Sequence, residues 1–305
     1  MPNFTEINRE IESEARAAKN PHDIIRHRYL QSFSEKSGRN VVAYYSGWLQ
    51  HTSPRYNYAV SINDEDKNGF MASFHQLDFA KGLDLILHTP GGAVAATESI
   101  IHYIRSKFGD DVRVFVPQLS MSGGTMIALS GKEIWMGLHS NLGPIDPQFG
   151  MQPAQLVLKE FDDALAAIKD DPDKIAIWRP ILEQIPPTFL STCKHAIDWS
   201  KEIGEKTLQD GMFKNDPDAA QKANTIVTGL TDPEKNKNHG KHLHRDECEA
   251  LGLKIMNLES DQETQDAILS VHHAFMISLM NSGITKIVEN HKGVSHIKTA
   301  APNEI

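Results

Sequence analysis

The sequence predicts an α/β fold, and the order of its apolar segments is the reason. Short apolar runs at residues 83–88, 112–117 and 133–136 are typical of buried strands. Helical patterns at residues 92–108 and 123–129 separate these runs. Strands that alternate with helices in this way form parallel βα units with right-handed crossovers. We therefore expect a parallel sheet covered by helices over this part of the chain.

Further elements are expected on both sides of these βα units, and most of them are helices. The apolar and aromatic run at residues 40–48 predicts a first buried strand. Residues 261–290 form one long amphipathic stretch with helical spacing, and the chain from His296 onward is interpreted as a loose tail. Other helical patterns lie at residues 5–28, 64–77, 153–169, 187–208 and 218–228.

The composition is that of a globular protein and disfavours several functions. Hydrophobic residues make up 40% and charged residues 23% of the chain. A net charge of −9 opposes nucleic-acid phosphates, so no nucleic-acid partner is expected. No apolar run approaches the roughly 20 residues that cross a bilayer, and the first segment lacks the pattern of a signal peptide. Cys193 and Cys248 stand far apart, which suits a reducing compartment. We expect a cytoplasmic protein with no membrane span.

A strand that ends in two glycines is the first candidate site. The apolar run at residues 85–88 meets Gly91 and Gly92 and passes directly into a helix. Such a turn exposes backbone N–H groups at a helix N-terminus, where partial positive charge can stabilise an oxyanion. Glycine also lets a substrate approach the backbone closely. An ordinary strand-to-helix turn would explain the glycines equally well.

The second candidate site follows the next strand. Ser122 stands directly before Gly123 and Gly124, which open a short apolar helix. A serine at this position would have the Gly123 N–H beside it as an oxyanion donor, so Ser122 is the natural nucleophile. The simpler alternative is a serine that only caps the helix. Ser120 is interpreted as a structural neighbour.

The two turns together resemble the superfamily of the Clp protease proteolytic subunit and signal peptide peptidase A. Four segments look more closely like the serine dehydrogenase proteinase family. The resemblance is good over residues 41–150 and continues weakly to residue 253, and residues 286–290 also fit. The four segments are Lys67-Asn68-Gly69-Phe70, residues 85–93, residues 121–125, and Gly143-Pro144-Ile145-Asp146-Pro147-Gln148.

This resemblance implies a Clp/crotonase-like β/α superhelix with a helical N-terminal arm and helical C-terminal additions. We accordingly expect an arm at residues 1–36, a catalytic domain at 37–260, and a C-terminal helix and tail at 261–305. The resemblance also implies peptide-bond hydrolysis through an acyl-enzyme and assembly into a homo-oligomeric ring or stack. In the superfamily, the positions that match Gly92 and Gly123 supply the oxyanion hole.

The general base is open to several assignments. His239 falls where the Clp subunit carries its triad aspartate, and Asp146 aligns approximately with the triad histidine, so the pattern departs from that of the Clp subunit. If the two positions exchange roles, the triad is Ser122, His239 and Asp146. His139 is an alternative base in the loop that precedes Asp146.

Lysine bases and a metal site are two further alternatives. A serine–lysine dyad like that of signal peptide peptidase A would use Lys159, Lys169 or Lys194, yet nothing in their surroundings singles one out, and they fit solvated helix faces. His239, His242 and His244 form a short histidine-rich cluster, but the sequence lacks a His-Glu-x-x-His helix. We expect no metal and no cofactor, and interpret His272-His273 as packing or surface residues.

Three function classes follow from these residues. The favoured one is a serine endopeptidase that acts on peptides or unfolded protein. A crotonase-like acyl-thioester enzyme would use the same oxyanion hole but would not require Ser122. An inactive Clp-fold assembly scaffold would keep only the oligomer contacts. No Gly-x-x-x-x-Gly-Lys loop occurs in the chain, so any ATPase would have to be a separate partner.

Overall fold

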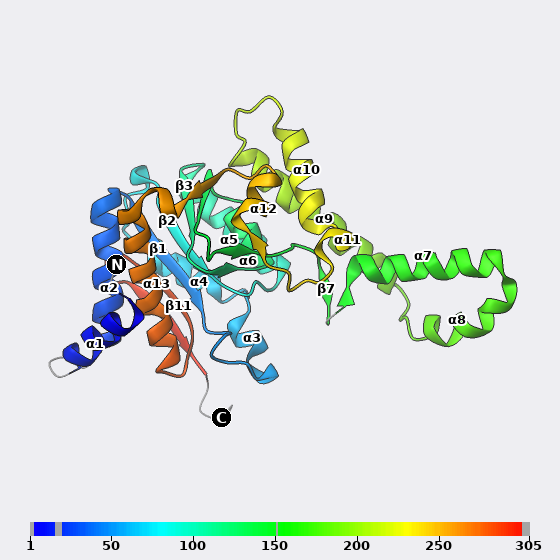
Figure 1. The fold of residues 1–305 in the computed structure, drawn as a ribbon, viewed down its shortest axis with the longest axis horizontal. Helices are drawn as coiled ribbons and strands as arrows, with labels where there is room; N and C mark the ends of the chain where they lie inside the picture. The colour runs from blue at the N-terminus through cyan, green and yellow to red at the C-terminus, as the bar shows by residue number, and fades with distance from the viewer. Residues whose placement is uncertain (1–2, 16–19, 151, 301–305) are drawn as a thin grey trace.

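The central sheet has seven strands in the part of the chain that the structure describes, residues 3–15, 20–150 and 152–300. The structure is a computed structural model, and Figure 1 shows its ribbon. The strands lie in the order β10-β5-β3-β2-β1-β11-β12. Five are mutually parallel: β1 (Asn40–Ser46), β2 (Leu83–His88), β3 (Val112–Val116), β5 (Glu133–Met136) and β10 (Ile255–Asn257). The predicted α/β fold with a mainly parallel sheet is confirmed.

Helices cover both faces of this sheet because side chains alternate along each strand. On β1, Val42 and Tyr44 join the larger apolar cluster, whereas Ala43 and Tyr45 join a second cluster on the opposite face. The larger cluster is covered by α4 (Asp66–Phe74), α5 (Val94–Phe108), α6 (Gly123–Ala128), α9 (Phe189–Asp210) and α10 (Ala219–Thr231). The second is covered by α2 (Pro21–Ser37) and α13 (Gln262–Met280), and α1 (Phe4–Glu14) packs outside them.

A helical arm projects from one end of the molecule. It consists of α7 (Ala154–Asp170) and α8 (Ile175–Leu182), and the chain returns along α9 to the body (Figure 1). Ala154, Cys193 and Ile197 form a small apolar cluster at its base. None of the helices in the described ranges is long and apolar enough to cross a membrane.

The remaining elements are short. They comprise α3 (Asn57–Val60), α11 (Pro233–Asn236), α12 (Arg245–Ala250), the paired strands β7 (Gln148–Phe149) and β8 (Gln152–Pro153), and 3-10 helices at Pro54–Tyr56, Phe79–Lys81, Pro172–Lys174 and Leu258–Ser260.

The prediction for the C-terminal part is wrong beyond Met280. Helix α13 ends there, and the chain continues as β11 (Ile284–Asn290), which pairs antiparallel with β1. Ile287 therefore lies on a strand, since residues 284–288, which are β-branched except for Lys286, follow a Ser-Gly turn and favour extended structure. The described part of the segment interpreted as a tail lies mostly in β12 (Ser295–Thr299), which pairs with β11, and residues 301–305 of that segment lie outside the described residues.

The N-terminal segment also differs from the single helix predicted at residues 5–28. Helix α1 ends at Glu14, and α2 begins at Pro21, a residue that suits the first turn of a helix. Residues 16–19 of the predicted helix lie outside the described residues.

A small three-stranded sheet gathers the segments that carry the candidate site. Its strands are β4 (Leu119–Ser120), β6 (Asn141–Leu142) and β9 (Leu243–His244). Strand β4 leads directly to Ser122, β6 leads to Asp146, and β9 follows the loop that holds His239. Three distant parts of the sequence are thereby brought to the carboxyl-terminal edge of the parallel strands.

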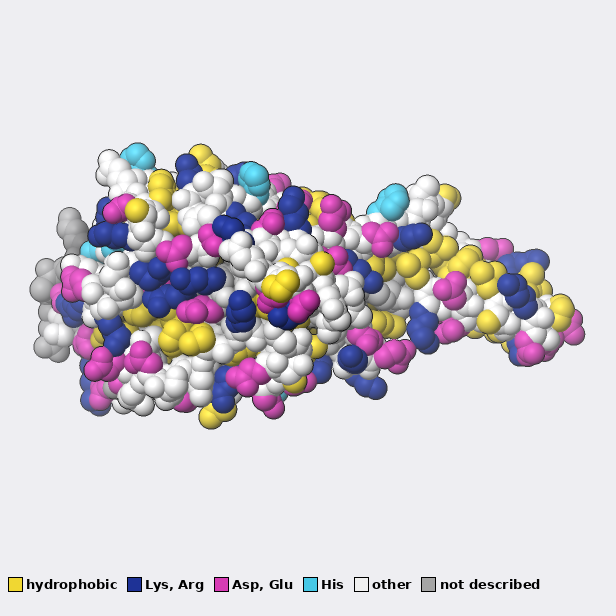
Figure 2. All heavy atoms as spheres, turned by 90° about the horizontal axis from the view of Figure 1, so that it is seen from above, with side chains coloured by type: hydrophobic (Ala, Val, Ile, Leu, Met, Phe, Trp, Pro, Cys, Tyr) yellow, Lys and Arg dark blue, Asp and Glu magenta, His cyan; other side chains and the backbone are white. Residues whose placement is uncertain are grey.

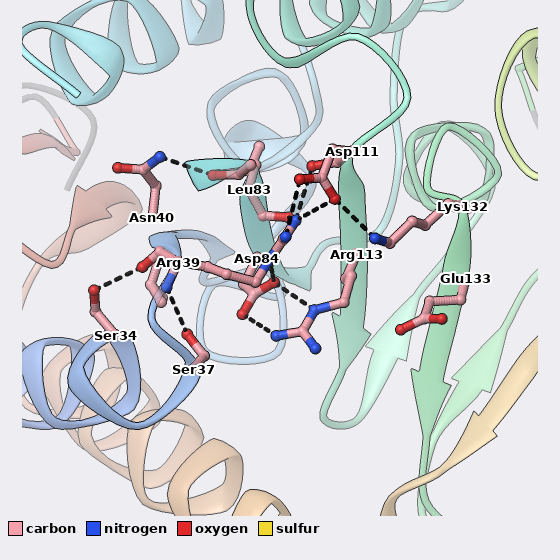
Figure 3. Close-up of polar contacts among 12 residues, drawn as sticks. Ser34, Ser37, Arg39, Asn40, Leu83, Asp84, Asp111, Arg113, Lys132 and Glu133 are labelled. Atoms are coloured by element: carbon pink, nitrogen blue, oxygen red, sulfur yellow. Dashed lines mark hydrogen bonds and ion pairs between the residues drawn. The ribbon is translucent and has the colours of Figure 1, made fainter. Parts of the chain in front are cut away.

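A network of charged side chains connects the amino-terminal ends of the parallel strands, as Figure 3 shows. The carboxylate of Asp84 is buried and accepts hydrogen bonds from Arg39 (2.7 Å) and from both Nε and Nη2 of Arg113 (2.7 and 2.6 Å). Asp111 binds Arg39 and Lys132, and the hydrogen bond from Arg39 lowers the pKa of Asp111 to about 2. Because a buried carboxylate is stable only when paired, this network ties together the starts of β1, β2 and β3.

Candidate active site

Ser122 adopts a backbone conformation that a non-glycine residue rarely takes. Its φ is 50° and its ψ −114°, in the sharp turn between β4 and α6. The side chain makes no capping hydrogen bond to α6, although Ser122 occupies the N-cap position. The alternative of a serine that only caps the helix is therefore wrong. A strained turn at a serine whose hydroxyl donates to no described residue of the helix behind it is typical of a functional residue.

The two glycine turns lie side by side. The Thr89 N–H donates to the Leu119 carbonyl (3.1 Å), and the Met121 N–H donates to the Thr89 carbonyl (2.9 Å). Gly91 has a φ of 90°, and a Cβ atom there would lie 2.6 Å from the Met121 oxygen and 2.7 Å from the Cβ of Ser122. Only glycine permits this close approach.

The N–H groups of Gly92 and Gly123 are adjacent and free. A Cβ atom on Gly123 would lie 3.3 Å from the Gly92 nitrogen. In the described ranges neither N–H donates a hydrogen bond to another residue, whereas the flanking residues of Gly92 are both bonded to Ile62. Two unpaired donors beside a serine can hold the oxygen of a tetrahedral oxyanion.

His239 is held by Asp146. Its Nδ1 atom lies 2.8 Å from Asp146 Oδ1, and Gln148 Nε2 donates to Asp146 Oδ2 at 2.6 Å. An ionised carboxylate only accepts hydrogen bonds, so this contact places the proton of a neutral His239 on Nδ1. Nε2 is then left as a proton acceptor, which is the arrangement of a general base. The Asp146 side chain is buried and that of His239 is partly exposed.

All of these groups line one cavity of about 890 Å³. Its lining includes Gly91, Gly92, Ser122, Gly123, Asp146 and His239, the six residues that the sequence analysis selected. Much of the remaining wall is apolar, from Val94, Met126, Ile145 and Phe149. The volume lies in the range of ordinary ligand pockets.

Helix α9 forms a wall that sequence reasoning missed. Thr192, His195 and Trp199 recur at helical spacing and all line the cavity. The helix itself was predicted, but no motif in it indicates a contact with the glycine turns. The contact arises from the packing of α9 against α5 and α6, which lie far from it in the sequence.

The alternative bases lie elsewhere. His139 does not line the cavity, and burial lowers its pKa. Lys159, Lys169 and Lys194 are exposed and are not among the lining residues either. Over the described residues, no group of three or more His, Cys, Asp or Glu side chains is arranged to hold a metal ion.

Comparisons with known proteins relate most of this chain to one family. Residues 22–265 match the family model described as ClpP-like SDH-type serine proteinase. An uncharacterized protein of Methanocaldococcus jannaschii is 33% identical over 159 residues, covering 51% of this chain and 55% of that protein. A second uncharacterized protein of the same organism is 40% identical over 163 residues, covering 51% of this chain and 53% of that protein. The chain thus spans about half the length of the curated relatives it matches.

Proposed function

This chain belongs to the ClpP-like SDH-type serine proteinase family, and from that premise we propose that it is a serine peptidase with Ser122 as its nucleophile. One observation carries the proposal. A single cavity is lined by three features: a serine in a strained turn that makes no capping hydrogen bond, two backbone N–H groups without a partner among the described residues, and a histidine oriented by a buried carboxylate. Each part is needed for acyl transfer, and an ordinary structural turn would need none of them together.

The proposed reaction has two steps. The Ser122 hydroxyl attacks the scissile carbonyl carbon while His239 Nε2 takes its proton, and the N–H groups of Gly92 and Gly123 bind the oxyanion. The C–N bond then breaks, His239 protonates the leaving amine, and an acyl-enzyme remains. Water then attacks the ester carbonyl while His239 takes its proton. As the ester C–O bond breaks, His239 returns that proton to the Ser122 oxygen, and the acid and the free serine are released. Asp146 stabilises the imidazolium in both steps.

The projecting arm supports self-association as a second part of this proposal. No residue of α8 is buried, although the helix carries Ile175, Ile177 and Ile181, and Ile177 is 69% exposed. Figure 2 shows hydrophobic side chains gathered along the arm. Apolar surface of this kind marks contact sites, and a second copy of the chain can cover it symmetrically.

The first test is labelling with a fluorophosphonate probe, which reacts only with an activated serine. We expect the unmodified chain to be labelled and Ser122→Ala not to be labelled. Hydrolysis of unfolded protein or of a fluorogenic peptide library should disappear in the same variant. Absence of labelling in folded, assembled protein would contradict the proposal, whereas turnover of an acyl-thioester without Ser122 would favour the crotonase-like alternative.

A further inference from the structure

A buried ion pair lies near the cavity but outside its lining. Lys286 on β11 and Asp66 at the start of α4 are each 1% exposed, and Lys286 Nζ lies 2.9 and 2.8 Å from the two oxygens of Asp66. Removing two charges from water is costly, and well-packed apolar residues often stabilise a core as well or better. Stability alone therefore gives a weak reason for this pair.

The remaining bonds of the pair converge on one short segment. Asp66 Oδ2 accepts from the Asn63 backbone N–H (2.9 Å) and from the Tyr44 hydroxyl (3.0 Å). Lys286 Nζ donates to the Ser61 carbonyl oxygen. The pair thus holds the backbone on both sides of Ile62, and Ser61 itself lines the cavity.

Ile62 in turn holds the backbone on both sides of Gly92. The Ile62 N–H donates to the Gly91 carbonyl (2.8 Å), and the Ala93 N–H donates to the Ile62 carbonyl (2.9 Å). A Cβ atom on Gly92 would lie 2.3 Å from both the nitrogen and the oxygen of Ile62. The Gly92 N–H itself donates no hydrogen bond to the described residues, and its nitrogen lies 3.3 Å from where a Cβ atom on Gly123 would be.

We propose that Lys286 and Asp66 are positioning residues for the oxyanion hole: they fix Ile62, and Ile62 fixes the direction of the Gly92 N–H. The inference rests on the proposed peptidase function. An oxyanion donor acts only at about 2.7–3.1 Å from the developing charge, and a misplacement of about 1 Å can cost on the order of 100-fold in rate. Charged side chains from α4 and β11 that both hydrogen-bond to the backbone beside Ile62 can supply this precision.

The test compares Lys286→Met, Asp66→Asn and the double variant with the unmodified enzyme. The double variant leaves no unpaired charge buried, so it keeps the test open if a single variant does not fold. Lys292→Met is the matched control, because Lys292 follows the same strand and also donates to a backbone carbonyl, that of Gln76 (2.7 Å), rather than to Asp66 or Ser61. Circular dichroism and thermal unfolding establish that each variant is folded.

We expect kcat for a peptide substrate to fall about 10- to 100-fold in the folded variants of the pair, with KM within about twofold, and we expect Lys292→Met to leave kcat unchanged. Affinity for a peptide aldehyde, whose adduct places an oxyanion in the hole, should fall in parallel with kcat. A folded double variant with unchanged kcat overturns the inference. A rise in KM with unchanged kcat overturns it as well. If the unmodified chain shows no Ser122-dependent hydrolysis, the proposed function itself fails first.

Discussion

The Nδ1 atom of His239 lies 2.8 Å from Asp146 Oδ1, although 93 positions separate the two residues in the chain. The chain between them leaves after β6, includes the whole projecting arm, and comes back just before β9. Strands β6 and β9, which flank this stretch of chain, pair directly and bring its two ends together. Two predictions follow from the roles that we propose for the pair.

Replacement of the histidine should remove proton transfer. We expect His239→Ala to lower kcat for a peptide substrate by about 10²- to 10⁴-fold, which is the usual contribution of a general base. His139→Ala is the matched control, because His139 is a nearby loop histidine outside the cavity, and its rate should stay within about twofold. Steady-state kinetics and fluorophosphonate labelling measure both variants. Equal losses in the two would mean that His239 is not the base.

The carboxylate should matter through its charge rather than its size. Asp146→Asn keeps the volume of the side chain but presents an amide to His239 Nδ1 and favours the wrong tautomer. We expect kcat to fall by up to about 10⁴-fold with little change in KM or in the unfolding temperature. A variant that loses activity only as it loses folded protein would assign Asp146 a structural role instead.

How much of this site the sequence could predict depends on how far apart its residues lie along the chain. Ser122, Gly92 and Gly123 lie in local strand-to-helix turns, so a motif reveals them. The Asp146–His239 contact depends on the pairing of β6 with β9, and only family resemblance suggested it. The wall from α9 carries no local signal at all. The spacing predicts a helix over β11 because Ile287 continues the apolar pattern of α13, and only the pairing of β11 with β1 distinguishes the two.

Position 91 should require glycine for two reasons: its φ is positive, and no side chain fits between it and the neighbouring turn. Gly91→Ala would add a Cβ atom at 2.6–2.7 Å from Met121, Ser122 and Gly123, at a φ of 90°. Gly38→Ala is the control, because Gly38 has a φ of 68° but no atom within 4 Å of such a Cβ. We expect Gly38→Ala to cost about 1 kcal/mol of unfolding free energy and to keep activity. Gly91→Ala should cost more and abolish labelling of Ser122, as urea unfolding and the probe would show.

The apolar face of α8 should control assembly. Ile177→Lys places a charge on a side chain that is 69% exposed, so the isolated chain should fold normally. If a second copy covers α8, burial of that charge without a partner will weaken the contact, and light scattering should show a smaller species. Lys174→Met, near the start of the same helix, is the control and should leave the assembly intact. An unchanged mass for Ile177→Lys would exclude α8 from the contact.

A buried histidine beside the glycine turn should make the fold sensitive to acid. His88 is fully buried at the end of β2, its ring centroid lies 4.3 Å from that of Trp48, and neither ring nitrogen has a hydrogen-bond partner among the described residues. Burial lowers the pKa of His88 to about 3. The unfolded chain, with a histidine pKa near 6.5, then binds a proton that the folded chain does not.

The sign of the effect follows from this difference. Stability is fully present above about pH 6.5 and is lost as the pH falls toward 3, at about 1.4 kcal/mol per pH unit for His88 alone. His272, whose pKa burial also lowers, adds to the slope. Between pH 7 and pH 5, His88→Phe should lose about 2 kcal/mol less unfolding free energy than the unmodified chain, as urea titrations at the two pH values would measure. An identical loss in both proteins would show that His88 takes up its proton equally in the folded and the unfolded chain. Its burial would then not contribute to the loss of stability in acid.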